Sequence, residues 1–165
     1  MFFIYQIIVT LLIFLSPFII IFRIFKNKED KKRFIEKFSL PTKKYRDGNL
    51  IWFHGASVGE ILSIVPLIKN YEKNKSIKQI LVTSSTLSSS KVLSKYNFKK
   101  TIHQFYPIDH MYFTKKFLNY WKPKIAIFIE SEIWPCMYKE INEKNIPLIL
   151  LNARLTKKTF QRWMK

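Results

Sequence analysis

Residues 50–61 read LIWFHGASVGEI, and this stretch decides the fold of the chain. The apolar run 50–53 predicts a buried strand, and the small residues behind it predict a tight turn. Apolar side chains then recur at 61, 62, 65 and 68, which is the spacing of one face of a helix. Gly55 and Gly59 allow the backbone to pass where larger side chains would obstruct it. Since open parallel sheets bind ligands at such strand-to-helix corners, we expect the chemistry of the chain here.

The alternation of strand and helix continues through the rest of the chain. Short apolar runs, rich in β-branched and aromatic residues, predict strands at 50–54, 79–84, 102–106, 124–129 and 147–151. Helical patterns follow these runs at 59–74, about 88–96, 111–120, 133–145 and from 156 onward. Alternation at this spacing predicts βαβ units, and therefore an α/β fold in which helices cover both faces of a parallel sheet.

The N-terminus predicts a membrane segment. Residues 2–22 contain no charged side chain and are long enough to cross a bilayer as a helix. A cleaved signal peptide fits poorly, because no basic residue precedes the run and no small-residue cleavage site follows it. The basic residues begin at Arg23, which favours a cytoplasmic location for everything after the span. We therefore expect a single-pass anchor at 1–22, a basic juxtamembrane linker at 23–48 that lies on anionic headgroups, and a domain at 49–165.

The composition limits the class of partner. The chain has 165 residues and a formal net charge of +18, which favours a polyanionic neighbour. We expect no nucleic acid, because the basic residues are scattered and no aromatic stacking platform accompanies them. The hydrophobic content of 48% argues against a disordered basic tail. Cys136 is the single cysteine and cannot form an internal disulfide, so we interpret it as a small buried side chain.

Ser57 is a candidate nucleophile, because residues 55–59 read G-x-S-x-G between a strand and a helix. A serine hydrolase also needs an acid and a histidine that can form a relay with the serine. Asp109 is followed only by its neighbour His110, and His103 precedes Asp109, so the order of these residues supports a triad weakly. The alternative interpretation of Ser57 is a hydroxyl that caps the helix.

Three carboxylates are sharper candidates. Glu60 lies in the first turn of the helix at the expected cleft, where it either complements the helix dipole or acts as a general base. Glu130 and Glu132 follow the predicted strand 124–129, whose end lies at the same edge of the sheet. Either they act there beside Glu60, or Glu132 opens the next helix and Glu130 pairs with a lysine or arginine. Arg154 follows the next strand and is the natural counter-charge or phosphate ligand. The histidines show no metal-ligand spacing, so we expect no metal site.

Three segments together resemble a known family. Residues 52–60, WFHGASVGE, are similar to its W-F-H-x-A-S-V-G-E signature, and residues 130–135, ESEIWP, are similar to its E-[TS]-E-[LI]-W-P. Residues 151–155, LNARL, resemble its x-N-A-R-[LM]-S, and the preceding residues 147–150 resemble the strand that leads into that motif. The family is the 3-deoxy-D-manno-octulosonic acid (Kdo) transferases of lipopolysaccharide synthesis. Gly55 stands where many relatives carry alanine, and Cys136 where asparagine is common.

The resemblance implies a fold and a reaction. It implies an inverting GT-B glycosyltransferase with two Rossmann-like domains, which uses no metal or other cofactor. The N-terminal domain receives the lipid A precursor at the cytoplasmic side of the inner membrane, and the C-terminal domain holds the donor CMP-Kdo. The resemblance makes Glu60 the base and Glu130 a residue that stabilises the transition state. The other motif residues are then expected to bind substrate: Ser57, Gly59, Glu132 and Arg154.

The length of the chain is the main departure from this family. We expect the C-terminal donor domain to be absent and residues 49–165 to be the acceptor half of a transferase that is inactive by itself. Two alternatives stay open. One is a membrane-bound module that binds lipid A without catalysis, and the other, less favoured, is a serine hydrolase that uses Ser57.

Overall fold

The computed structural model describes residues 2–130, 132–153 and 161. Five parallel strands form one sheet in the order β3-β2-β1-β4-β5, which is the strand order of the doubly wound Rossmann fold. Each strand is short, and every pair of neighbouring strands runs parallel. The strands are β1 Leu50–His54, β2 Gln79–Ser84, β3 Thr101–Phe105, β4 Ile125–Ile129 and β5 Leu148–Leu151.

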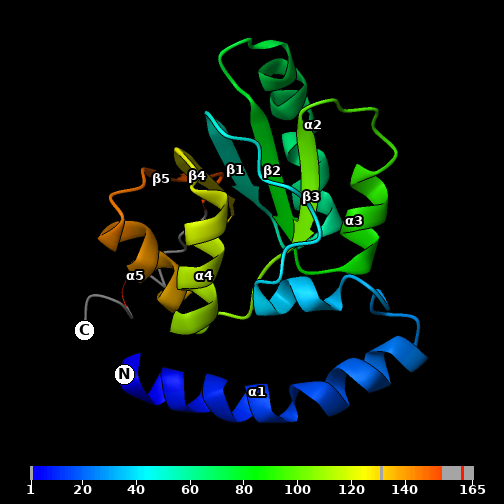
Figure 1. Cartoon of the computed structure of the whole chain (residues 1–165), viewed down its shortest axis with the longest axis vertical. Coiled ribbons are helices and arrows are strands. Elements are labelled where there is room, and N and C mark those ends of the chain that lie inside the picture. The colour runs from blue at the N-terminus through cyan, green and yellow to red at the C-terminus, as the bar shows by residue number, and fades with distance from the viewer. Residues whose placement is uncertain (1, 131, 154–160, 162–165) are drawn as a thin grey trace.

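Helices cover both faces of the sheet (Figure 1). α2 and α3 pack together on one face, and α4 and α5 pack together on the other. α2 contains Pro66 and nevertheless continues as one helix of 16 residues. The four helices are α2 Val58–Lys73, α3 Leu87–Leu93, α4 Met111–Trp121 and α5 Pro135–Glu143.

The two halves of the core follow from the alternation of side chains along β1. Trp52 points to the side of α4 and α5 and packs against Phe117 of α4 and Phe128 of β4. Phe53 points to the opposite side, into the cluster that contains Ile61 and Ile64 of α2. All of these side chains are buried, so β1 lies in apolar surroundings on both faces, as expected for the central strand of a parallel sheet.

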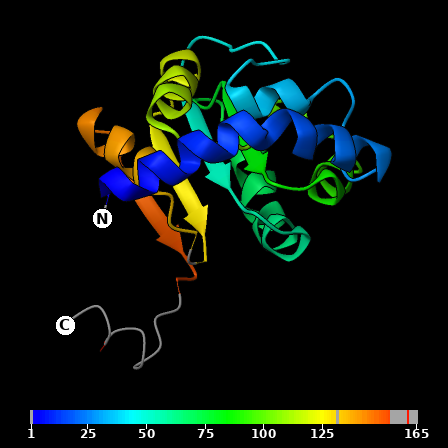
Figure 2. The same cartoon turned by 90° about the horizontal axis from the view of Figure 1, so that it is seen from below.

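The first helix lies outside these layers. α1, Phe2–Phe25, lies beneath the edge of the sheet at which the strands end (Figure 1), and in the view from below it crosses in front of the strands (Figure 2). We call this edge the carboxyl edge. α1 is the only helix in the described part of the chain that is long and apolar enough to cross a membrane.

The segment predicted as a linker contains a short 3-10 helix, η1 Phe34–Phe38, that packs on the domain. Its Glu36 is fully buried and accepts hydrogen bonds from the Arg33 guanidinium at 2.9 Å and from the backbone N–H of Phe105 at 2.7 Å. Glu36 also accepts a hydrogen bond from Thr42. These bonds fix the residues that follow α1 to the end of β3.

The predicted α/β fold is confirmed, with small shifts at the element boundaries. The strands begin and end within one residue of the predicted positions. The helix predicted at 88–96 is shorter, and the one predicted at 133–145 begins at Pro135, where proline favours the first turn. The predicted anchor extends to Phe25, and the helix predicted from 156 onward lies outside the described residues.

Candidate active site

The first part of the site is the corner between β1 and α2. Ser57 caps α2, because its hydroxyl accepts the backbone N–H of Glu60 at 3.3 Å. The Glu60 carboxylate folds back and accepts the backbone N–H of Ala56 at 2.8 Å. This reciprocal arrangement resembles a capping box and fixes the position of the carboxylate. Gly55 makes room for it, since an added Cβ would lie 3.1 Å from the Cβ of Glu60.

Gly59 and Ser57 are exposed at the start of α2. A Cβ added at Gly59 would meet only the Ser57 hydroxyl, at 3.9 Å, so the space over the first turn is open. Glu60 itself is largely buried, with 8% of its surface exposed. A ligand that approaches the corner would therefore contact the open turn before it reaches the carboxylate.

The second part of the site follows β4. Glu130 adopts a left-handed conformation with φ of 60°, and its backbone N–H donates to the carbonyl of Leu151 at 2.8 Å. Non-glycine residues in this region store strain of about 1–3 kcal/mol, and such residues cluster at functional sites. This turn brings Glu132 toward the first corner, where its carboxylate lies 3.9 Å from Nε2 of His54.

Glu60 and Glu130 lie near enough to Glu132 for their negative charges to act on it. Burial raises the pKa of Glu132, and the negative charge of Glu60 and then that of Glu130 raise it further. The structure therefore places Glu132, which follows β4, near Glu60 at the start of α2. Repulsion between these carboxylates favours the neutral form of Glu132, or a bound cationic or hydroxyl group near it.

Two residues that sequence reasoning did not select complete the site. The His54 ring is fully buried and stacks on Tyr106 with 3.9 Å between ring centroids. His54 Nδ1 lies 3.0 Å from the Thr83 hydroxyl, and burial lowers the pKa of His54 to about 3, so the ring is neutral. Within the described residues, neither His54 Nε2 nor the Tyr106 hydroxyl has a hydrogen-bond partner. A buried polar atom without a partner costs free energy, so this edge is suited to a polar ligand.

An apolar cavity of about 440 Å³ lies between α1 and the carboxyl edge of the sheet. Tyr106 and Trp134 line it on the side of the sheet, and both also pack near the His54 ring. Tyr5, Val9 and neighbouring residues of α1 line the opposite side. The cavity therefore lies between α1 and the aromatic residues beside His54, and its mostly apolar lining suits a hydrocarbon chain.

Comparison with known proteins now decides the family. A family model described as 3-Deoxy-D-manno-octulosonic-acid transferase (kdotransferase) matches residues 32–165. The chain belongs to this Kdo transferase family. The matched range begins after α1 and contains η1, the whole sheet and every candidate residue at its carboxyl edge.

Curated relatives agree with this assignment. The chain is 45% identical over 149 residues to the 3-deoxy-D-manno-octulosonic acid transferase of Rickettsia bellii, which is 90% of this chain and 35% of that protein. It is 36% identical over 164 residues to a probable mitochondrial 3-deoxy-D-manno-octulosonic acid transferase of Arabidopsis thaliana, which is 98% of this chain and 37% of that protein. A bifunctional glycosyltransferase/methyltransferase of Fusobacterium nucleatum is 34% identical over 141 residues, which is 84% of this chain and 22% of that protein. The chain thus spans about a third of the first two relatives.

In the described part of this Kdo transferase-family chain, no catalytic triad supports the serine hydrolase alternative. Ser57 serves as a helix cap, and no hydrogen bond there joins it to a histidine. Asp109 is buried and accepts the backbone N–H groups of Cys136 and Met137 at the start of α5. His110 caps α4 instead of facing Asp109 as a relay partner. Cys136 is buried, as predicted.

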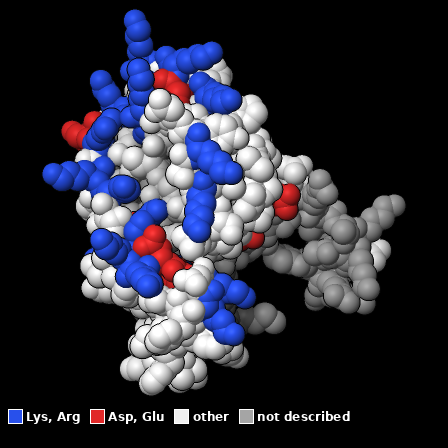
Figure 3. All heavy atoms as spheres, turned by 90° about the vertical axis from the view of Figure 1, so that its right-hand side faces the viewer, with Lys and Arg blue, Asp and Glu red and all other residues white. Residues whose placement is uncertain are grey.

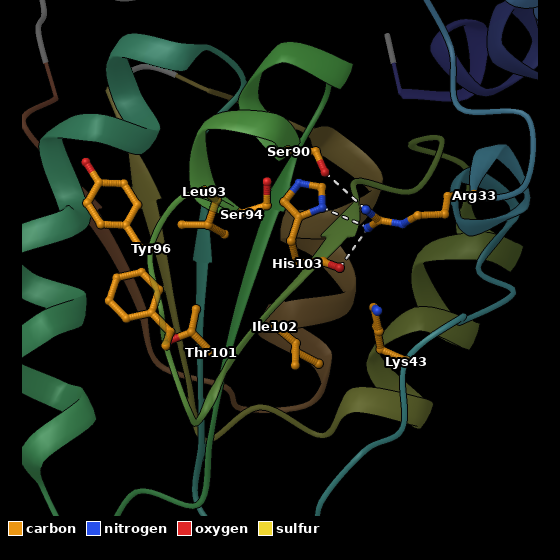
Figure 4. A pocket seen from close by; sticks show the side chains of 10 residues that line it. Arg33, Lys43, Ser90, Leu93, Ser94, Tyr96, Thr101, Ile102 and His103 are labelled. Atoms are coloured by element: carbon orange, nitrogen blue, oxygen red, sulfur yellow. Dashed lines mark hydrogen bonds between the residues drawn. The ribbon is translucent and has the colours of Figure 1, made fainter.

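A second cavity, of about 240 Å³, lies between β3, α3 and the residues around η1 (Figure 4). Arg33 reaches its wall, but the guanidinium already donates to Ser90 at 3.0 Å and lies 2.8 Å from His103 Nδ1, besides its pairing with Glu36. Because the charge is neutralised and its donors are occupied, this cavity is a weaker candidate than the carboxyl edge.

Arg154, the predicted counter-charge, lies outside the described residues. Among residues 2–130, 132–153 and 161, no three histidine, cysteine or acidic side chains are grouped to hold a metal ion. The expectation of a reaction without metal or other cofactor stays a prediction.

Proposed function

We propose that this chain is the acceptor-binding half of a GT-B glycosyltransferase that transfers Kdo from CMP-Kdo to the lipid A precursor in lipopolysaccharide biosynthesis. The observation that carries the proposal is the position of Glu60. Its carboxylate is fixed by the Ala56 N–H at 2.8 Å near Glu132, and an apolar cavity lies at the same edge of the sheet. A base for glycosyl transfer needs this combination of a fixed carboxylate and an adjacent site for a lipid-linked hydroxyl.

The proposed reaction is an inverting displacement. Glu60 takes the proton of an acceptor hydroxyl as the hydroxyl oxygen forms a bond to the anomeric carbon of Kdo. The bond between that carbon and the phosphate oxygen of CMP breaks, and CMP leaves with the electron pair. Glu130 stabilises the transition state, and Ser57, Gly59, Glu132 and Arg154 bind substrate. No metal or other cofactor takes part in this proposal.

The proposed acceptor is amphiphilic, which fits the two sides of the site. Acyl chains of the lipid A precursor would enter the cavity that Tyr5, Val9 and Tyr106 line. The sugar hydroxyl would lie over the open first turn of α2, within reach of Glu60. We place the domain on the cytoplasmic side of the inner membrane, held there by α1 and by basic residues that contact anionic lipids.

The donor site is proposed to lie in sequence beyond these 165 residues, because the chain spans about a third of its Rickettsia bellii relative. The 165-residue polypeptide alone is then expected to bind the acceptor but neither to bind CMP-Kdo nor to transfer sugar. Transfer by this polypeptide alone would contradict the proposed division of the two substrates.

The test uses the native product in its own membranes. Its intact mass is compared with the 19.9 kDa of the chain, and transfer from CMP-Kdo to a tetraacylated disaccharide bisphosphate is assayed. Glu60→Gln should lower the rate about 10²- to 10⁴-fold, the usual contribution of a general base. Glu143→Gln, the same chemical change on the exposed side of α5, is the matched control and should keep wild-type activity.

The outcomes separate the alternatives. Loss of transfer in Glu60→Gln but not in Glu143→Gln supports the transferase. Loss of activity in Ser57→Ala with an active Glu60→Gln variant would contradict it and favour the hydrolase. A native product of 19.9 kDa that binds the acceptor without transfer favours a binding module that lacks catalysis.

A further inference from the structure

One face of α1 contacts the domain. Its inward side chains recur every three or four residues, and they include Tyr5, Val9, Ser16 and Ile20. Val9, Ser16 and Ile20 are buried, although most residues of this 24-residue helix are exposed. Such spacing defines one continuous helix face, so the contact is a stripe and not a hinge at one end.

Polar contacts fix both ends of this stripe. In the second turn, the Tyr5 hydroxyl donates to Asp109 at 2.7 Å, and the same carboxylate holds the first N–H groups of α5. In the last turn, Arg23 forms an ion pair with the buried Glu29 at 3.0 Å. The two contacts are 18 residues apart on the helix, which corresponds to about 27 Å along its axis at 1.5 Å per residue.

The outward face of α1 is apolar from end to end. Phe3, Phe14 and Phe25 are 73%, 75% and 81% exposed, and the residues between them on this face are aliphatic or aromatic. In Figure 3 the base of the molecule, where α1 lies in Figure 1, is white, and the lysine and arginine side chains gather above it. An exposed apolar surface of this extent under a basic domain fits the boundary of an anionic bilayer.

The packing is incompatible with a helix that crosses the bilayer while it holds these contacts. A spanning α1 would carry the charged groups that lie against it, among them Asp109 and Lys37, into the hydrocarbon layer. The free energy cost of burying such groups in lipid excludes that position. A helix that lies flat keeps the domain in water and its own outward face in lipid.

We propose that α1 lies in the plane of the membrane as an interfacial helix, in place of the single-pass span that composition predicts. Its outward face occupies the acyl boundary of one leaflet, and its inward face carries the domain. The exposed lysines that follow it, Lys26, Lys28, Lys31 and Lys32, then lie at the level of the headgroups. This inference rests on the packing of α1 and is independent of the proposed reaction.

The test measures depth at three matched positions. Phe3, Phe14 and Phe25 are 11 residues apart, close to three helical turns, so they share one face. Each is replaced by cysteine in turn, spin-labelled, and bound to vesicles of phosphatidylethanolamine and phosphatidylglycerol. Accessibility to oxygen and to a water-soluble nickel chelate gives the depth of each label. The background is Cys136→Ala, or the native chain, in which Cys136 is buried and protected from the label.

An in-plane helix predicts nearly equal depths at the three positions. A span predicts that label 14 lies about 16 Å deeper than labels 3 and 25, from 11 residues at 1.5 Å each. A depth profile with such a maximum at position 14 would overturn the proposal. Labels that stay accessible to the nickel chelate at all three positions would also overturn it, because the helix would then not be in lipid. Leu62→Cys, on an exposed position of α2, is the control that should stay in water.

Discussion

Two buried neutral histidines should make the protein lose stability as the pH falls below 7. Burial lowers the pKa of His54 to about 3. Burial, followed by the positive charges of Arg33 and Lys43, lowers the pKa of His103 to about 3. His103 has no room for a second proton, since Nδ1 lies 2.8 Å from the Arg33 guanidinium and Nε2 lies 2.8 Å from the Ser84 hydroxyl.

The direction of this pH dependence follows from the number of protons that each state binds. Histidine in the unfolded chain has a pKa of about 6.5, so between this pH and about 3 the unfolded state binds more protons than the folded state. The stability that these groups contribute is complete above pH 6.5 and decreases as the pH falls. Between about pH 7.5 and pH 5, each histidine should remove about 2 kcal/mol from the free energy of unfolding, and both together about 4 kcal/mol.

The measurement is urea unfolding of the 165-residue chain in bicelles at several pH values, followed by tryptophan fluorescence. Trp52 and Trp121 are fully buried and report loss of the core. His103→Gln keeps a donor and an acceptor for its partners but does not titrate. This variant should therefore lose about 2 kcal/mol less than wild type between about pH 7.5 and pH 5.

Buried carboxyls change the pH dependence of stability in the opposite direction. Comparison of wild type with His103→Gln cancels their contribution. Burial raises the pKa values of Asp109 and Glu132, so their contribution to stability increases as the pH falls. The same carboxyls are present in wild type and in His103→Gln, so the difference between the two pH profiles reports the histidine. Parallel profiles for wild type, His54→Gln and His103→Gln would refute the reasoning.

Three further predictions use the same unfolding assay at neutral pH. Ser57→Ala removes the cap that accepts the Glu60 N–H and should cost about 1 kcal/mol; an unchanged midpoint would show that the cap is not used. Phe128→Ala opens the fully buried centre of the core and should cost about 3–5 kcal/mol, and a loss below 1 kcal/mol would contradict its packing. Glu36→Gln leaves Arg33 without its partner and should cost about 3 kcal/mol, a loss that the double variant with Arg33→Met should partly restore.

The sheet could be predicted because buried parallel strands carry their own signal. Residues 50–54 and 79–84 are nearly continuous apolar runs that end in turn residues, and the structure has strands at those same positions. The edge at which the carboxylates meet follows from the same rule, since all strands of a parallel sheet end on one side. For this reason the grouping of Glu60 and Glu132 was accessible from sequence.

The contacts between distant segments could not be predicted. Glu36 belongs to a basic stretch that looks solvated, but the backbone N–H that it accepts comes from Phe105, 69 residues later. In the sequence, Tyr106 is only an aromatic residue at the end of a predicted strand. Its stacking on His54 depends on how two strands are placed in the sheet. α1 is apolar on every side, so its sequence holds no asymmetry that would indicate which face packs on the domain.

The two proposals meet at the carboxyl edge of the sheet. A spanning anchor joined by a flexible linker would hold the domain near the membrane and leave its rotation free, so the edge would face the lipid only part of the time. η1 and the stripe on α1 remove this freedom, because Glu36 and Asp109 join the helix and its following residues to the sheet. With α1 in the plane of the leaflet, the apolar cavity lies beside the acyl layer, at the same edge of the sheet as Glu60. An acceptor could then present its hydroxyl without leaving the bilayer. The domain loses its orientational entropy relative to the membrane once, when α1 docks, and not at each turnover.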